Sequence, residues 1–162
     1  MSNNLQSRIE SKDAKIGVVG LGYVGLPLAV EFAKAGFSVT GIEISQERVD
    51  RLNRGDNYIS DVDGSELSSF VESGRFVATT DYSVVSDLDA VSICVPTPLS
   101  KLKDPDVSFI QSALDELVKY IHSGLLVVLE STTYPGTTRE LILPPLTAEG
   151  SEVGKDFFLC FS

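Results

Sequence analysis

The sequence of 162 residues has no tryptophan, one histidine, one methionine and two cysteines. One histidine and two distant cysteines do not supply the closely spaced ligands of a zinc site, so we expect no metal. Cys94 and Cys160 both lie in apolar runs, and we interpret them as reduced, buried thiols rather than a disulfide framework. His122 precedes Ser123-Gly124, so we expect a residue at a helix end and not the histidine base that many hydride-transferring enzymes use.

Basic residues and long apolar runs are also scarce. The chain has 13 lysines and arginines against 23 acidic residues, and a net charge of -10, which argues against a nucleic-acid partner. No apolar run approaches the roughly 18 residues of a membrane span. Residues 1–14 are polar, lack the apolar core of a signal peptide and are expected to form a frayed tail. We therefore expect a cytoplasmic protein with no membrane partner, whose remaining residues, 15–162, form one domain.

A glycine-rich turn lies between two apolar runs, Ile16 to Val19 and Leu26 to Phe32. Its pattern, G-x-G-x-x-G, predicts a strand that turns into a helix around a dinucleotide: the first glycine allows the turn, the second admits the pyrophosphate, and the third lets the helix pack closely. A tight turn without a ligand is the alternative. The predicted cofactor-binding residues are Gly20, Leu21, Gly22, Tyr23, Val24 and Gly25.

An acidic residue follows the second apolar strand at the expected distance. Glu43 lies 18 residues after Gly25, where a carboxylate would accept hydrogen bonds from the adenosine ribose and repel a 2′-phosphate. This position favours NAD over NADP, unless Glu43 is only an exposed residue at a strand end. Arg48 could lie over the adenine or reach a phosphate, or could be a solvated helix residue.

Two later loops are predicted to leave strands at the same edge of the sheet. The first, residues 94–99, contains Pro96 and Thr97, and the second, residues 130–138, contains Ser131 and Thr132. Their hydroxyl groups could bind ribose, phosphate or nicotinamide, or could cap helices.

The remaining pattern alternates between strands and helices, and the strands are apolar throughout, as in a parallel sheet covered on both faces. We therefore predict an α/β, Rossmann-type, doubly wound sheet of about six strands with helices on both faces. The expected strands are 15–20, 37–43, 76–79, 90–95, 125–129 and 157–161, and the expected helical segments are 23–34, 46–52, 65–73, 81–86, 107–121 and 137–146. Residues 53–64 are expected to be irregular.

Three motifs in this order resemble the UDP-glucose/GDP-mannose dehydrogenase family over about residues 15–162. They are residues 20–27, Val95-Pro-Thr-Pro98, and Glu130-Ser-Thr followed by Pro-Gly-Thr-Thr138. The segment CVPTPL followed by Asp104-Pro-Asp-Val-Ser-Phe is most similar to UDP-N-acetylglucosamine 6-dehydrogenases.

The resemblance implies an enzyme that oxidises C6 of a nucleotide sugar twice with two NAD, for surface polysaccharides. It implies cofactor roles for the glycine turn, Glu43, Arg48 and Thr97, and an active-site role for Thr132. The family's catalytic cysteine belongs to a later domain, so Cys160 is not expected to be the nucleophile. The whole protein is expected to be a homodimer or larger, and this chain, ending inside a family motif, to be inactive alone.

Two other interpretations remain open. The chain could be a complete NAD-binding sensor or interaction module, or another Rossmann enzyme such as a hydroxy-acid dehydrogenase or a methyltransferase. Within the family, UDP-glucose, UDP-N-acetylmannosamine and GDP-mannose are alternative substrates.

Overall fold

The computed structural model describes residues 2–98, 105–148 and 150–162. Leu99 and Asp104, which belong to motifs noted above, lie outside the described residues. Six strands form one parallel sheet in the order β3-β2-β1-β4-β5-β6. This order confirms the predicted Rossmann-type fold, in which the strand order reverses beside β1. The strands are β1 (Lys15–Val19), β2 (Ser38–Ile42), β3 (Phe76–Thr79), β4 (Ala90–Ile93), β5 (Leu126–Leu129) and β6 (Phe158–Phe161).

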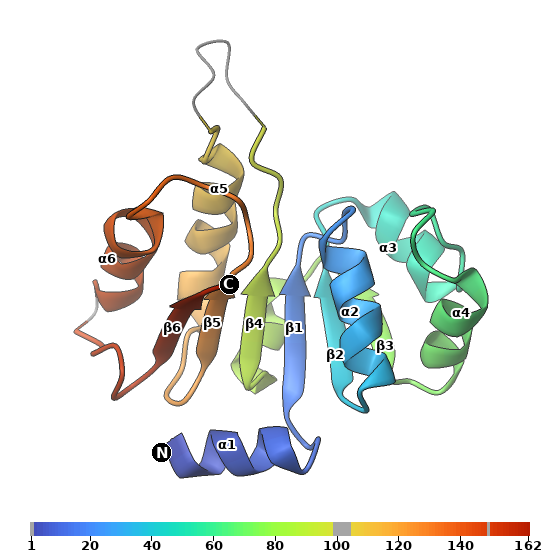
Figure 1. Ribbon diagram of the computed structural model, residues 1–162, viewed down its shortest axis with the longest axis horizontal. Helices are drawn as coiled ribbons and strands as arrows, with labels where there is room; N and C mark the ends of the chain where they lie inside the picture. Colours follow the sequence, from blue (N-terminus) through green and yellow to red (C-terminus); the bar gives the residue numbers. More distant parts are fainter. Residues whose placement is uncertain (1, 99–104, 149) are drawn as a thin grey trace.

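The strand register brings the carboxyl ends of the central strands to one level. Val19 of β1 is opposite Ile42 of β2 on one side and opposite Ile93 of β4 on the other. The loops that follow these three strands therefore meet at one edge of the sheet, above β1 in Figure 1. Ligands of open parallel sheets bind at this kind of edge, where the strand order reverses.

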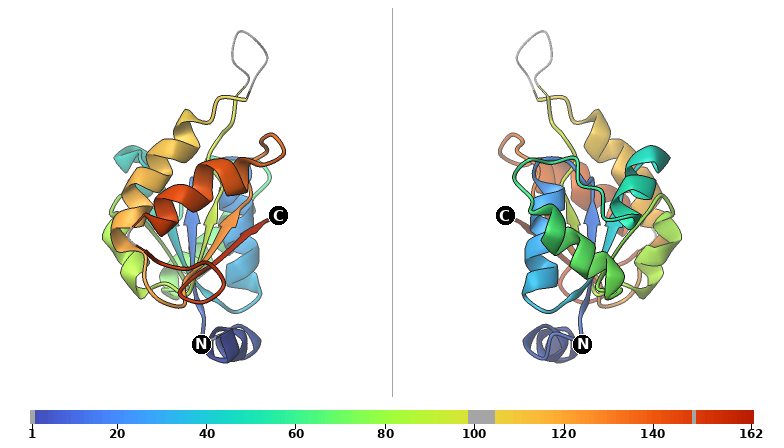
Figure 2. Two further views of the ribbon diagram at one scale, coloured as in Figure 1. Left: turned by 90° about the vertical axis from the view of Figure 1, so that its left-hand side faces the viewer. Right: turned by 90° about the vertical axis from the view of Figure 1, so that its right-hand side faces the viewer.

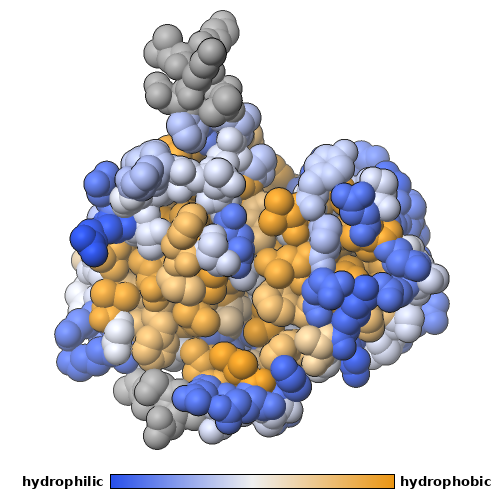
Figure 3. Space-filling model, viewed as in Figure 1, coloured by the Kyte–Doolittle hydropathy of each residue, from blue (hydrophilic) through white to orange (hydrophobic). Residues whose placement is uncertain are grey.

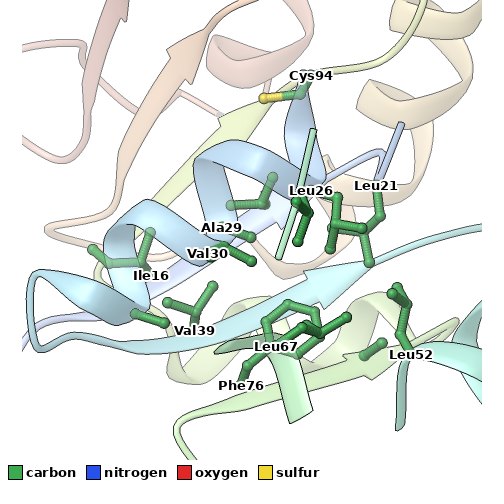
Figure 4. Close-up of a cluster of buried hydrophobic side chains, with 14 of the residues drawn as sticks. Ile16, Leu21, Leu26, Ala29, Val30, Val39, Leu52, Leu67, Phe76 and Cys94 are labelled. Atoms are coloured by element: carbon green, nitrogen blue, oxygen red, sulfur yellow. The ribbon is translucent and has the colours of Figure 1, made fainter. Parts of the chain in front are cut away.

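Helices cover both faces of the sheet, and a separate core lies under each layer (Figures 1 and 2). One core includes Leu26 and Ala29 of α2, Leu52 of α3 and Leu67 of α4 (Figure 4). The other includes Ile110 of α5, with η1 and α6 on the same side. The covering helices are α2 (Gly25–Lys34), α3 (Gln46–Asn53), α4 (Gly64–Glu72), η1 (Tyr82–Asp87), α5 (Ser108–Leu117), η2 (Val118–Tyr120), η3 (Thr138–Ile142) and α6 (Leu143–Thr147).

Several elements differ from their predictions. The helix expected over residues 107–121 ends at Leu117 and continues as the short turn η2. The helix expected over residues 137–146 begins as a π-helix, η3, and becomes α-helical at Leu143. Pro144 and Pro145 lie in the first turn of this α-helix, where a missing N–H donor costs little.

Cys160 is exposed, and its prediction as a buried thiol was wrong. It lies on β6, an edge strand that pairs only with β5 among the described residues. On the face of the sheet that carries α2, apolar side chains of β5 and β6 remain partly exposed. They include Leu126 and Phe158, which are opposite each other in the register. Figure 3 shows apolar residues gathered on this face of the molecule.

The N-terminal segment is not a frayed tail but contains a helix, α1 (Ser2–Glu10). Figure 1 places it beneath the amino ends of the strands, opposite the edge where the loops meet. Asp89 fixes its end, because one carboxylate oxygen pairs with Arg8 and the other accepts a hydrogen bond from the N–H of Lys15 at 2.7 Å. These two contacts connect α1 to the start of β1 and to Asp89, which directly precedes β4. Both involve a charged carboxylate and are therefore stronger than hydrogen bonds between neutral groups.

We expect the change Asp89→Ala to release α1. Loss of the two charged hydrogen bonds should lower the free energy of unfolding by about 1–3 kcal/mol, measured by urea unfolding. Proteolytic cleavage next to α1 should also become faster. Asp87→Ala removes an exposed carboxylate two residues away and serves as the control. Equal effects of the two substitutions would contradict this account of α1.

Candidate functional site

A cleft of about 1340 Å³ opens at the edge where the loops after β1, β2, β4 and β5 meet. It collects predicted site residues from all four loops, which lie far apart in the sequence. Leu21 and Gly25 do not line it, because both are buried beneath the turn. The predicted residues that do line it are Gly20, Gly22, Tyr23, Val24, Glu43, Arg48, Pro96, Thr97, Ser131 and Thr132.

The glycine turn brings α2 into direct contact with β1. Gly20 has a φ of +88°, which L side chains rarely adopt, and a Cβ on Gly25 would lie 1.7 Å from the carbonyl oxygen of Gly20. At Gly22, in contrast, a Cβ would meet no atom within 4 Å. The first and third glycines are thus required by the fold, whereas the second borders the open cleft.

The turn leaves hydrogen-bond donors available at the start of α2. Among the described residues, the N–H groups of Gly22, Tyr23 and Val24 have no acceptor, while the carbonyl of Gly22 accepts from Leu26 at 3.1 Å. Unpaired N–H groups at a helix N-terminus favour an anion such as a phosphate. This arrangement fits the pyrophosphate of a dinucleotide.

Glu43 is buried rather than exposed at a strand end, with a relative exposure of 6%. Its carboxylate accepts hydrogen bonds from the N–H of Leu21 at 3.1 Å and the N–H of Ser45 at 3.2 Å. Arg48 lies in the first turn of α3, and its Nη1 lies 3.7 Å from Oε2 of Glu43. The carboxylate is therefore fixed beside the glycine turn, and Arg48 lies over it instead of extending into solvent alone. Leu21, predicted to bind the cofactor, uses its N–H for this internal bond.

The hydroxyl groups of the two later loops join these loops to each other. Thr97 donates to the carbonyl of Thr132 at 2.6 Å, and buried Ser131 donates to the carbonyl of Val95 at 2.7 Å. Neither side chain is a helix cap, which was the alternative drawn from the sequence. The protons of Thr97 and Ser131 are used within the protein, and their oxygen lone pairs are the groups left for a ligand. Thr132 is exposed at the cleft.

Sequence reasoning missed several residues that line the cleft. Ile44 follows Glu43 and lines the cleft with a relative exposure of 81%. Tyr58 comes from the segment predicted as irregular, and its position depends on contacts across 37 residues that no local pattern reveals. Arg51 and Tyr82 also line the cleft.

The cleft contains no activated nucleophile among the described residues. Cys94 borders it, but burial, and secondarily Glu130, raises the pKa of its thiol to about 12. Burial also raises the pKa of Cys160, again with Glu130 as the second cause. His122 lies outside the cleft, where its Nε2 is 2.9 Å from the carbonyl of Leu88. No three His, Cys, Asp or Glu side chains in the described ranges are placed to hold a metal.

This strand order, with a glycine turn and a buried carboxylate at the point where the order reverses, defines a Rossmann-type dinucleotide-binding domain. The comparison with known families then specifies the class. The family described as "UDP-glucose/GDP-mannose dehydrogenase family, NAD binding domain" matches residues 14–161. The chain therefore belongs to this family, and its cofactor is NAD.

Curated relatives include UDP-N-acetyl-D-glucosamine 6-dehydrogenase from Pseudomonas aeruginosa, which is 38% identical over 152 residues, 93% of this chain and 35% of the relative. UDP-N-acetyl-D-mannosamine dehydrogenase from Pyrococcus horikoshii is 35% identical over 148 residues, 90% of this chain and 35% of the relative. The chain thus spans about a third of the length of these relatives.

Solved structures agree with this assignment. GDP-mannose dehydrogenase from Pseudomonas aeruginosa has a TM-score of 0.84 at 32% identity, over 89% of this chain and 34% of that protein. NDP-N-acetyl-D-galactosaminuronic acid dehydrogenase from Methanosarcina mazei has a TM-score of 0.80 at 37% identity, over 96% of this chain and 36% of that protein. No helix in the described ranges is long and apolar enough to cross a membrane.

The second and third glycines of the turn should respond differently to alanine. Gly22→Ala places a methyl group in the open cleft, so we expect normal folding and at least tenfold weaker NAD binding. Gly25→Ala places it against a backbone carbonyl, so we expect a chain that does not fold. Thermal unfolding and calorimetric titration with NAD measure both effects. Folding of the Gly25 variant, or full NAD affinity of the Gly22 variant, would contradict these assignments.

Two tyrosines of the cleft should ionise late. Burial is the main cause that raises the pKa of Tyr58 and of Tyr82 to about 12 each. The unfolded chain loses these protons near pH 10, whereas the folded chain retains them, so stability should fall as the pH rises from 10 to 12. Phenolate absorbance during alkaline titration measures this, and Tyr58→Phe and Tyr82→Phe should each remove one late phase. Ionisation of both groups by pH 10 would be the opposite result.

Proposed function

We propose that this chain is the NAD-binding part of a nucleotide-sugar 6-dehydrogenase, which oxidises C6 of a UDP-sugar to the uronic acid. UDP-N-acetylglucosamine is the first candidate substrate. The sequence motifs and the Pseudomonas aeruginosa relative support it. UDP-N-acetylmannosamine is the second candidate, supported by the Pyrococcus horikoshii relative. The observation that carries the proposal is the cleft itself, where N–H groups without an acceptor among the described residues lie beside a buried carboxylate.

The proposed division of roles follows the cleft from one end to the other. The N–H groups of residues 22–24 bind the pyrophosphate, and Glu43 accepts from the adenosine ribose, with Arg48 above it. Pro96, Thr97 and Ser131 shape the other end, where the nicotinamide ring binds. We assign Thr132 to the active site, because its exposed side chain borders the cleft beside this end.

The proposed reaction has a fixed stoichiometry that the whole enzyme must provide for. Oxidation of a primary alcohol to a carboxylate removes two hydrides, adds one oxygen from water and releases three protons. NAD, when bound, supplies the hydride acceptor, one molecule for each step. The thiols of this chain are poor candidates for a covalent intermediate, because burial raises the pKa of Cys94 to about 12 and the exposed Cys160 does not line the cleft. We therefore assign the nucleophilic cysteine to another part of the enzyme, and expect this chain alone to bind NAD without turnover.

Glu43→Gln tests the cofactor assignment. The change removes the charge that repels a 2′-phosphate and leaves Arg48 without its carboxylate, so the ratio of NAD to NADP affinity should fall by about tenfold, or ~1.4 kcal/mol. Calorimetric titration of the 162-residue chain with both dinucleotides measures this ratio. Glu72→Gln, which removes an exposed carboxylate on α4, is the control for net charge. Tighter binding of NADP than NAD by the unchanged chain would overturn the proposed role of Glu43.

The substrate assignment needs the whole protein. We expect two NADH per sugar with UDP-N-acetylglucosamine, and slower turnover with UDP-N-acetylmannosamine, UDP-glucose and GDP-mannose. A higher kcat/KM for any of the other three would replace the proposed substrate. Turnover of a UDP-sugar by the 162-residue chain alone would contradict the division of roles.

A further inference from the structure

The segment between α3 and α4, predicted only as irregular, is held in one conformation by its own side chains. Asn57 donates to the carbonyls of Ile59 and Val62 at 2.7 and 2.6 Å, and its Oδ1 accepts from the N–H of Ile59 at 2.9 Å. Ile59 and Val62 are buried in the core beneath α2. The segment is thus fixed both by the hydrogen bonds of Asn57 and by its buried side chains. Tyr58 lies within this segment and lines the cleft.

The hydroxyl group of Tyr58 forms a hydrogen bond with the glycine turn. It donates to the carbonyl oxygen of Leu21 at 2.7 Å. A peptide group is planar and trans, so a fixed Leu21 carbonyl also fixes the direction of the Gly22 N–H, which points the opposite way. This N–H has no acceptor among the described residues. Since Glu43 holds the N–H of Leu21, the turn is constrained on both sides of this residue.

The ring of Tyr58 contacts two arginines of α3. Its centroid lies 5.4 Å from Cζ of Arg48 and 5.5 Å from Cζ of Arg51, distances at which a guanidinium is attracted to an aromatic face. Asp56 holds Arg51 through two hydrogen bonds, of 2.8 and 3.3 Å. Arg48, 52% exposed, has the ring and Glu43 as its contacts in the cleft. One side chain therefore contacts both the turn and the cationic end of the site.

We propose that Tyr58 is a positioning residue of the NAD site, which directs the Gly22 N–H toward the pyrophosphate and holds Arg48 at the adenosine end. The inference rests on the proposed function, because it requires the dinucleotide to bind in this cleft. It adds a residue from outside the glycine turn and outside the strand ends. Tyr58 is a protonated donor at neutral pH, as any tyrosine is with an ordinary pKa of about 10, and burial raises its pKa further, to about 12.

Tyr58→Phe separates the hydroxyl from the ring. Loss of one hydrogen bond to the turn should weaken NAD binding about fivefold in calorimetric titrations. The amide resonance of Gly22 in the ¹⁵N NMR spectrum of the free protein should also shift, because its peptide group loses a fixed partner. Tyr58→Leu removes the ring as well and should weaken binding by a further two- to threefold.

Tyr120→Phe is the matched control, because it removes a tyrosine hydroxyl from η2, which does not border the cleft. Weaker NAD binding together with a shifted Gly22 resonance in Tyr58→Phe, and neither in Tyr120→Phe, supports the inference. Unchanged affinity or an unchanged Gly22 resonance in Tyr58→Phe overturns it. If the unchanged chain fails to bind NAD, the proposed function falls instead, so the two failures are distinguishable.

Discussion

The contact between α2 and the carbonyl of Gly20 is the constraint on which the site depends. A Cβ on Gly25 would lie within 1.7 Å of that oxygen, so helix and strand meet more closely than any residue with a side chain permits. This closeness places the first N–H groups of α2 directly above the end of β1. A helix that began further away would still cover the sheet, but its N-terminus would not border the cleft.

The rest of the site is arranged around this contact by bonds between segments distant in sequence. Glu43 connects the end of β2 to the turn through the N–H of Leu21. Thr97 and Ser131 connect the loops after β4 and β5 to each other. Each bond uses a polar group that the sequence suggested for ligand binding, so part of the site's polarity serves to position its loops. Buried and partly buried polar groups need such partners, and satisfying them also fixes the shape of the cleft.

The sequence predicted the fold and the main lines of the site because both follow from short patterns. Apolar strands, helical periodicity and glycine spacing are local signals, and the parallel order then brings Glu43 to the turn. Tyr58 had no such signal, since its partner Leu21 is 37 residues away. The helix α1 also depends on a distant partner, Asp89, and a polar segment without a visible core contact looks like a tail. The sequence therefore missed contacts between distant segments, and with them the helix α1, whose end is fixed by one of these contacts.

The charge at one end of the cleft is opposite in sign to the net charge of the chain. The protein carries a net charge of -10, yet the end of the cleft that we propose for the adenosine has two arginines beside one tyrosine ring. An acidic protein needs positive charge at the site itself in order to bind an anionic dinucleotide. The electrostatic potential near a site depends on nearby groups more than on the net charge of the protein. Glu43 pairs with Arg48 and offsets part of this positive charge. In the role that we propose for it, the Glu43 carboxylate repels an added 2′-phosphate. The carboxylate that anchors the turn is therefore also the group that we propose selects the cofactor.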